Sequence, residues 1–442
     1  MKRMFIGVKD GSAGEIKKRV QKLDNVTGVS VSDIGVNIEY DGSYAHIAQQ
    51  VSSWQEVDSV QLGAEKPLSV STQYEPLDSY LWHYRKAGLD KKSAESLVTR
   101  GVVAHNPVKI AVIDSGYRPS HPDAPSSVVA QSLVSGETAE DTGTDHSHGT
   151  HVLHSMGSPL NTSGVSGILS NFGVNAEFYI YKMFPSESGS QGSWLSALLD
   201  CISKGVDVVN MSFGYESYKE ISQGGSLAPT STVSANSINS NVILNSEVIA
   251  YKNVFDNAKT NGVIPVIASG NSYVVGSISG SNPRGPGGVD ASGYFVPPQD
   301  TVATPAILSQ ICPGVVSVGS ANYNGNKAFF SQKGKGLRIA AYSGDSLTNP
   351  ENTGFPNISL AGSTTNSINS YVFMQGTSMA TPIMAAIIGV ILATGVAGTN
   401  VSVSSSDVDK ILTKLYRGVS PNVLPDSTSN LGHGIFHSDW LL

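Results

Sequence analysis

Cysteine and charged residues are both scarce in this chain, and each shortage excludes a class of protein. Only 2 of the 442 residues are cysteine, Cys201 and Cys312, too few for a framework of disulfide bonds. Neither lies in the CxxC spacing of a metal site, so we interpret both as small buried residues. Charged residues make up 14% of the chain and the formal net charge is -7. The sequence therefore lacks the basic excess of nucleic-acid-binding proteins, and we expect no nucleic-acid partner.

Long hydrophobic runs are missing as well. The longest, Met379–Thr394, falls short of the roughly 20 apolar residues that span a membrane, and we interpret it as a buried helix. No apolar segment follows the Lys2-Arg3 pair, so the sequence predicts neither a signal peptide nor a membrane partner. Hydrophobic residues still make up 40% of the chain, which is enough for a large core.

Residues 1–74 have the pattern of a small separate unit, with a linker at 63–80 that contains two prolines. Apolar alternation predicts strands, and apolar residues at helical spacing predict helices. The expected elements are a strand at 4–8, a helix through 16–23, strands at 28–32 and 36–40, a helix from Ser43, and a strand near 57–62. That order is β-α-β-β-α-β, the ferredoxin-like α+β arrangement.

From Leu81 onward, apolar strands alternate with helical segments. The expected strands lie at 108–114, 206–212, 262–270 and 314–321, and the expected helices include 194–205 and 247–262. Continuous apolar strands between helices are typical of a parallel sheet that is covered on both faces. Functional residues in such sheets collect at the carboxyl ends of the strands. The sequence predicts one large α/β domain with surface insertions at about 215–245 and 272–304.

Three reactive side chains lie in glycine-rich turns. Asp114 ends an apolar strand in AVIDSG, His148 lies in HSHGTHV, and Ser378 lies in QGTSMATP at the start of a helix. Each residue taken alone is better explained by a structural role such as helix capping. Together they supply a nucleophile, a base and an orienting carboxylate for a serine hydrolase. Asn271 in ASGNS adds an amide that can donate a hydrogen bond to an oxyanion.

These four motifs, in this order, resemble those of the subtilisin-like serine proteases over residues 109–434. The resemblance implies a doubly wound, mostly parallel α/β fold preceded by a small α+β ferredoxin-like prodomain. It implies a serine endopeptidase that forms an acyl-enzyme. The implied roles are nucleophile for Ser378, general base and then acid for His148, orienting carboxylate for Asp114, and oxyanion donors for Asn271 and the Ser378 backbone N–H.

The resemblance also implies a role for the first unit. Pro-segments of the family chaperone and inhibit the protease before they are cut off, so residues 1–74 are expected to be the pro-segment and 75–442 the catalytic domain. Autocleavage is expected near Tyr74–Glu75. The implied partners are protein or peptide substrates and the chain's own pro-segment as inhibitor, and we expect a monomer. The family favours an extracellular location, although the sequence predicts no signal peptide.

Substrate and metal residues can be carried over in the same way. Two strand ends are expected to form the substrate cleft, with one edge at Ser212, Phe213 and Gly214 and the other side of the primary pocket at Ala268, Ser269 and Gly270. The glycines and small residues at the pocket walls imply broad specificity with an apolar or aromatic P1 side chain. The implied calcium ligands are the side chains of Asp123 and Asn161 and the carbonyls of Pro159, Ser163 and Val165. Asp78 is a candidate for a further ligand. The alternative is an Asx turn in a loop that binds nothing.

Crowded histidines leave a rival interpretation open. The histidines at 146, 148, 151 and 154 could hold zinc. Zinc hydrolases of the HExxH kind place a glutamate between the ligands, however, and this segment has none. A second rival is a catalytically silent relative that acts as a binding protein. The family pattern also breaks at His154, where a small residue is usual, and at Ile383, where a histidine is usual. We hypothesise that the ring added at one position fills the space lost at the other.

Overall fold

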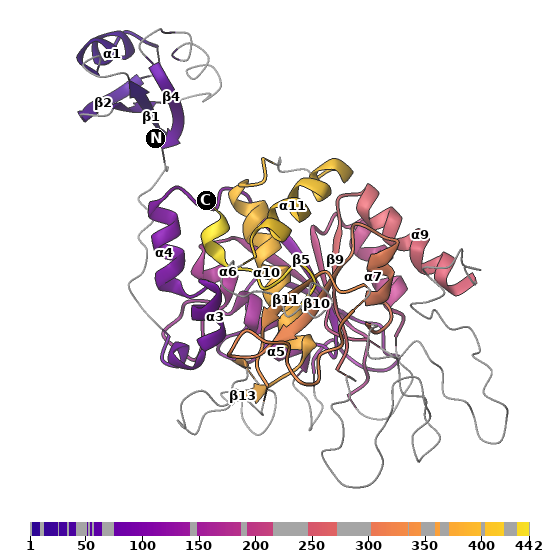
Figure 1. Cartoon of the computed structure of the whole chain (residues 1–442). Coiled ribbons are helices and arrows are strands. Elements are labelled where there is room, and N and C mark those ends of the chain that lie inside the picture. The colour runs from indigo at the N-terminus through magenta and orange to yellow at the C-terminus, as the bar shows by residue number, and fades with distance from the viewer. Residues whose placement is uncertain are drawn as a thin grey trace, which may run out of the picture. The chain divides into compact units, whose positions relative to one another are not determined.

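The chain forms two compact units, Met1–Thr72 and Gln73–Leu442 (Figure 1). The boundary lies two residues from the one that the sequence predicts. The computed structural model describes residues 2–8, 13–24, 26–32, 35–40, 51, 54, 57–63, 75–141, 148–186, 192–214, 246–271, 302–334, 336–345, 359–362, 371–398, 403–419 and 431–441.

The first unit is a four-stranded antiparallel sheet with one described helix. The strand order is β2-β3-β1-β4, with β1 paired to both β3 and β4. Its elements are β1 (Lys2–Val8), α1 (Ala13–Val20), β2 (Val26–Ser32), β3 (Gly35–Tyr40) and β4 (Val57–Gly63). Ile16 and Val20 are buried, as their helical spacing predicts. The expected strands and first helix are confirmed, whereas the helix expected from Ser43 lies, apart from Val51, outside the described residues.

A seven-stranded parallel sheet forms the centre of the second unit. Its order is β11-β10-β9-β8-β5-β7-β6. The strands are β5 (Val108–Asp114), β6 (Val128–Ser132), β7 (Ala176–Lys182), β8 (Val208–Met211), β9 (Ile264–Ala268), β10 (Val316–Ala321) and β11 (Ile339–Tyr342). The chain builds β5, β6 and β7 toward one edge and then crosses to β8 on the other side of β5. This reversal between β5 and β8 is the point where open α/β sheets bind ligands.

Alternate residues of β5 show that helices cover both faces of this sheet. Ile110 and Val112 belong to a core cluster that includes residues of α5 and α10, while Ala111 and Ile113 belong to a second cluster with residues of α7 and α9. The helices α7 and α9 lie together, away from α3 and α4 (Figure 1). The helices are α3 (Trp82–Ala87), α4 (Lys91–Thr99), α5 (His148–Gly157), α6 (Ile168–Asn171), α7 (Trp194–Ser203), α9 (Ser246–Thr260), α10 (Thr377–Thr394) and α11 (Ser405–Arg417).

Short elements complete the second unit. The strands β12 (Ser359–Gly362) and β13 (Tyr371–Met374) form a separate antiparallel pair. The unit also contains three described 3-10 turns, η1 (Asp78–Tyr80), η2 (Ala306–Gln310) and η3 (Ser438–Leu441). Among the described helices, α10 alone is long and apolar enough to span a membrane, yet 89% of its 18 residues are buried in the unit. This confirms the interpretation of the longest apolar run as a buried helix.

Candidate functional site

The predicted reactive residues meet at the strand ends where the sheet order reverses. Asp114 is the last residue of β5, and Ser212 follows β8 directly. The parallel register pairs Val112 with Asn210, so two residues further on Asp114 lies opposite Ser212. The sequence places both at turns, and the sheet brings the turns together because parallel strands end at the same edge.

Asp114 and His148 are joined by a hydrogen bond. Nδ1 of His148 lies 2.8 Å from Oδ1 of Asp114, and it is the donor because an ionised carboxylate can only accept. The Asp114 side chain is 1% exposed, while the imidazole is 31% exposed. Partial burial lowers the pKa of His148, but the charge and hydrogen bond of Asp114, with a smaller contribution from Asp141, outweigh it and leave this pKa above its ordinary value.

Glycine at position 149 is required for this arrangement. A Cβ added to Gly149 would lie 2.1 Å from the carbonyl oxygen of Gly116 and 3.2 Å from Cβ of Asp114. The first turn of α5 therefore rests directly on the turn that follows β5. Any larger residue would push His148 and Asp114 apart, so the glycine of the HGTH motif has a packing role beside the catalytic candidates.

Ser378 is the second residue of α10, and Pro382 determines how its backbone is held. Proline has no N–H, so Pro382 cannot donate the helical hydrogen bond to the carbonyl of Ser378. The hydroxyl of Ser212 donates to that carbonyl instead (2.8 Å), and the Ser378 hydroxyl donates to the carbonyl of Ser212 (2.9 Å). A hydroxyl has one proton to donate, so Ser378 must leave the Ser212 carbonyl before it can donate to an imidazole.

Asn271 is oriented by Thr377, the neighbour of Ser378. The backbone N–H and the hydroxyl of Thr377 both donate to Oδ1 of Asn271, each at 2.9 Å. Two donors on the oxygen assign the amide orientation and leave Nδ2 as the group that can donate elsewhere. Thr377 also accepts from the backbone N–H of Gly270 (3.2 Å). Sequence reasoning named Asn271 and missed Thr377, although it lies inside the GTSMATP motif.

The expected substrate walls lie on neighbouring strands. Pairing of Met211 with Ile267 sets the segments 212–214 and 268–270 beside each other. A Cβ on Gly214 would lie 3.1 Å from Cβ of Ala303 and 3.8 Å from the carbonyl oxygen of Ala268. Ala303 therefore lies against the residues that the sequence assigns to the cleft, although it belongs to none of the four motifs. Phe213 packs its ring edge-on against Phe184, with 5.8 Å between ring centroids.

Part of the predicted calcium loop lies against Asp123. This carboxylate is buried, and its Oδ2 accepts hydrogen bonds from the N–H of Val165 (3.1 Å) and the hydroxyl of Tyr371 (2.9 Å). Burial raises the pKa of Asp123 to about 6. Its Oδ1 is buried without a hydrogen-bond partner, and so is Oε2 of Glu75. Two unsatisfied buried carboxylate oxygens, one on each of these residues, suit a hard cation.

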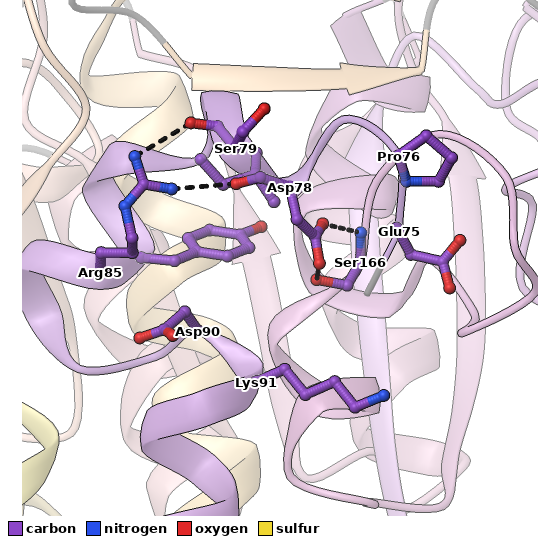
Figure 2. Close-up of a pocket in the computed structure, with 10 residues that line it drawn as sticks. Glu75, Pro76, Asp78, Ser79, Arg85, Asp90, Lys91 and Ser166 are labelled. Carbon is purple, nitrogen blue, oxygen red and sulfur yellow. Dashed lines mark hydrogen bonds between the residues drawn. The ribbon is translucent and has the colours of Figure 1, made fainter. Parts of the chain in front are cut away.

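Asp78 is engaged elsewhere. Its two carboxylate oxygens accept from the N–H (2.8 Å) and the hydroxyl (3.0 Å) of Ser166, as Figure 2 shows. The N-terminal segment therefore offers a free oxygen through Glu75, whose Oε1 accepts from Thr162 (3.2 Å), and not through Asp78. Asn161 forms the Asx turn of the alternative interpretation, because its Oδ1 accepts from the N–H of Ser163 (2.9 Å).

Among the crowded histidines, His151 and His154 are buried within α5, and His146 lies outside the described residues. The ring of His154 packs against that of His121, with 4.8 Å between centroids. The hypothesis paired the ring at position 154 with the space at Ile383. In the structure this ring packs against His121, which the hypothesis did not include. In the described part of the chain, no group of three or more His, Cys, Asp or Glu is arranged to hold a metal ion.

Comparison with known proteins places this geometry in a family. The family model described as "Subtilase family" matches residues 105–414. Subtilisin E of Bacillus subtilis (strain 168) is 29% identical over 317 residues, which cover 72% of this chain and 63% of that protein. Subtilisin DY of Bacillus licheniformis is 28% identical over 305 residues, covering 69% and 83%. The matched part thus spans less than two thirds of the length of subtilisin E.

Two solved structures share the fold. A protease from Pseudoalteromonas arctica has a TM-score of 0.55 at 23% identity, covering 84% of this chain and 98% of that chain. The epidermin leader peptide processing serine protease of Staphylococcus aureus has a TM-score of 0.58 at 19% identity, covering 99% and 97%. At these identities the likeness concerns the fold alone, and it agrees with the seven-stranded parallel sheet.

Proposed function

The chain belongs to the subtilase family, and from this premise we propose that it is a serine endopeptidase with Asp114, His148 and Ser378 as its triad. The observation that carries the proposal is the 2.8 Å hydrogen bond between His148 and buried Asp114, at the strand ends where Ser212 binds the backbone of Ser378. A histidine held in one tautomer by a carboxylate is what a serine needs in order to become a nucleophile.

In the proposed reaction, Ser378 Oγ attacks the carbonyl carbon of the scissile peptide bond while its proton passes to Nε2 of His148. Asp114 accepts the hydrogen bond from Nδ1–H, which stays on the imidazole, and stabilises the imidazolium that forms. His148 then returns the proton to the leaving amine, and a water molecule, activated by the same imidazole, hydrolyses the acyl-enzyme. The hydroxyl that now donates to Ser212 has to rotate toward His148 for the first of these steps.

The negative oxygen of the tetrahedral intermediate is assigned to Nδ2 of Asn271 and the backbone N–H of Ser378. The two hydrogen bonds from Thr377 to Oδ1 support this assignment, because they fix the amide before the substrate arrives. A donor that is already oriented loses no free energy to reorganisation as charge develops.

The proposed substrates are proteins or peptides with an apolar or aromatic P1 side chain. The small residues Ser212, Gly214 and 268–270 support an apolar pocket between the two strand ends. Ala303 is assigned to the same pocket because it lies close to Gly214. An extracellular site of action and a monomeric state, both implied by the family resemblance, are part of the same proposal.

Residues 1–74 are proposed to be a pro-segment that inhibits the catalytic domain until it is cut near Tyr74–Glu75. The separation into units at Thr72 and Gln73 and the β2-β3-β1-β4 sheet of the first unit support this assignment. Tyr74 itself lies outside the described residues.

Calcium is proposed to bind between Asp123, Glu75 and the loop 159–165. The ligands would be the free carboxylate oxygens of Asp123 and Glu75, the side chain of Asn161, and the carbonyls of Pro159, Ser163 and Val165. When bound, the ion would supply a structural charge that satisfies the two buried carboxylates and joins the N-terminal segment of the second unit to the loop.

Mass spectrometry of the purified wild type beside Ser378→Ala tests the catalytic proposal. The wild type is expected to lose a fragment that ends near Tyr74, to hydrolyse peptides, and to be inactivated by phenylmethylsulfonyl fluoride but not by a zinc chelator. Ser378→Ala should keep its full mass and show only background hydrolysis, because the substitution removes the proposed nucleophile. Efficient processing of the Ser378→Ala chain would remove Ser378 from the mechanism.

A further inference from the structure

The segment 139–141, which no sequence motif includes, lies on the turn that carries Asp114. The N–H of Tyr117 donates to the carbonyl of Ala139 (3.2 Å), and the N–H of Asp141 donates to the carbonyl of Tyr117 (3.0 Å). Gly116 has a φ of +100°, and a Cβ there would lie 2.4 Å from the carbonyl oxygen of Ala139. The close approach therefore depends on a glycine in a left-handed conformation.

One hydroxyl joins this segment to both sides of the site. The Asp141 side chain is buried, and its Oδ2 accepts from the hydroxyl of Ser115 (2.8 Å). The same Ser115 oxygen accepts from the backbone N–H of Gly149 in the first turn of α5 (3.0 Å). The backbone N–H of Ser115 donates to Oδ1 of Asp114 (2.7 Å), the oxygen that also binds His148. A chain of hydrogen bonds thus runs from Asp141 through Ser115 to Asp114 and to the residue after His148.

A buried lysine anchors the segment from the other side. Lys182 is paired with Asp114 in the sheet register, and its side chain is fully buried. Its Nζ donates to the carbonyl of Glu140 (2.8 Å) and to the hydroxyl of Ser186 (2.6 Å), and it forms an ion pair with Glu137 (2.9 Å). The residue before Asp141 is therefore fixed to β7, which determines where the Asp141 carboxylate lies.

We propose that Asp141 is a positioning residue of the catalytic site, which holds the Asp114 turn against α5 through Ser115 and stabilises the imidazolium form of His148 with its charge. This inference rests on the proposed triad. His148 carries a positive charge whenever it holds the proton of Ser378, so a second buried carboxylate nearby lowers the free energy of that state.

The charged groups around His148 are consistent with this role. Asp114 and Asp141 both raise the pKa of His148, and the ion pair of Lys182 with Glu137 lies on the neighbouring strand and its loop. A charge acts on a partly desolvated imidazole over a greater distance than it does in water. Asp141 precedes His148 by seven residues in a segment without recognisable pattern, which is why sequence reasoning missed it.

The test uses the processed enzyme and the rate at which diisopropyl fluorophosphate modifies Ser378, measured from pH 5 to pH 9. The reaction needs neutral His148, so the midpoint of the profile reports the pKa of that residue. The plateau reports both the geometry of the site and the stability of the imidazolium that forms during the attack. Asp141→Asn keeps an oxygen that can accept from Ser115 and removes only the charge. Asp207→Asn is the matched control, since Asp207 is a partly buried carboxylate that binds the N–H of Lys109 (2.7 Å) at the opposite end of β5.

Asp141→Asn is expected to lower the midpoint by about 0.5 to 1 pH unit and the plateau rate several-fold, because the imidazolium loses a neighbouring negative charge. Asp141→Glu should restore the midpoint, and Asp207→Asn should leave it at the wild-type value. An Asp141→Asn profile with the wild-type midpoint would overturn the electrostatic role.

Ser115→Ala is a second variant that tests the proposal if Asp141→Asn does not fold. This variant keeps the Asp141 charge and breaks the bridge, so the plateau should fall while the midpoint stays near that of the wild type. A wild-type plateau in Ser115→Ala would overturn the positioning role. Failure of the triad itself would look different, because the wild type would then resist the reagent at every pH or Ser378→Ala would react equally well.

Discussion

Two buried imidazoles give the molecule a sensitivity to acid. The rings of His83 and His154 are fully buried, and their nitrogens have no hydrogen-bond partner in the described structure. Burial, with a smaller effect from neighbouring His151, lowers the pKa of His83 to about 3, and burial lowers that of His154 well below its ordinary value. Both side chains are therefore neutral in the folded state at pH values where the unfolded chain is protonated.

Stability should fall as the pH drops through the ordinary histidine pKa of 6.5. Below this value the unfolded state binds a proton that folded His83 does not accept until about pH 3, so each such residue removes about 1.4 kcal/mol of unfolding free energy per pH unit. His83→Phe keeps a ring beside Tyr84 and should reduce this slope by the contribution of one residue. Urea unfolding of the Ser378→Ala protein between pH 7 and pH 5 measures the slope.

His105→Gln is the matched control for that measurement, because His105 is an exposed histidine. The control should keep the slope of the parent protein. Equal slopes in His83→Phe and the parent would show that His83 is not a buried neutral residue.

At the scale of single residues, the sequence was informative where chemistry is local. Asp114, His148, Asn271 and Ser378 each lie in a short motif, and the structure brings the motifs to one edge of the sheet. Residues that contact the site from distant parts of the chain do not lie in such motifs. Asp141 reaches the site through Ser115, so its position depends on hydrogen bonds that no spacing along the chain expresses.

At the scale of elements, the contact between α5 and the turn after β5 sets the geometry of the site. The backbone of Gly149 touches the carbonyl of Gly116, so the helix and the strand end have no tolerance for a side chain between them. The hydrogen bond from Gly149 to Ser115 fixes the same contact from the side (3.0 Å). The packing of α5 against the turn after β5 thus determines the distance from His148 to Asp114, together with the two side chains themselves.

Gly149→Ala should reduce kcat/KM by about 10²-fold or more, because a methyl group 2.1 Å from a carbonyl oxygen must displace the start of α5, and a shift of 1 Å has an effect of that size. Peptide hydrolysis and thermal unfolding measure the two consequences. Gly205→Ala is the control, since a Cβ there meets no atom within 4 Å and only the backbone conformation is strained. Undiminished kcat/KM in Gly149→Ala would show that the contact is not restrictive.

The sequence predicted the positions of the central strands better than those of several strands beside them in the sheet. The apolar run 108–114 became β5 without change, and the three other expected strands were each shortened at one or both ends. Apolar runs identify strands that are buried on both faces, because both sides of such a strand need apolar residues. The strands β6, β7 and β11 of the same sheet were not among those expected. β6 is a half-exposed edge strand, and its residues lack the continuous apolar pattern that marks the centre of the sheet.

At the scale of the whole molecule, the proposed calcium site would join distant parts of the second unit. Glu75 stands at the beginning of this unit, Asp123 follows β5, and Thr162 lies in the loop after α5. The hydrogen bond from Leu77 to the carbonyl of Gly164 (2.8 Å) already connects the first and last of these segments. A bound cation would therefore stabilise the folded unit and not the unfolded chain.

Calcium should raise the unfolding free energy of the processed protein by about 3 kcal/mol at a hundredfold excess over its Kd, as mass action requires for an ion that binds only the folded state. Calorimetry in calcium and in EGTA measures the difference in Tm. Asp123→Asn should abolish the response to calcium. Asp200→Asn alters a carboxylate on α7 that binds Tyr181 and Lys204, and it should keep the response. A Tm that is the same in calcium and EGTA would disprove the site.

The proline in the first turns of α10 has a consequence for the order of assembly. Because Pro382 cannot bind the carbonyl of Ser378, that carbonyl must obtain its donor from Ser212, 166 residues earlier in the chain. The α10 helix alone cannot supply this hydrogen bond, which forms only where α10 lies beside the end of β8. The proposed nucleophile would thus be held in place only in the folded unit, and the proposed cleavage of polypeptides would be deferred until the chain has folded.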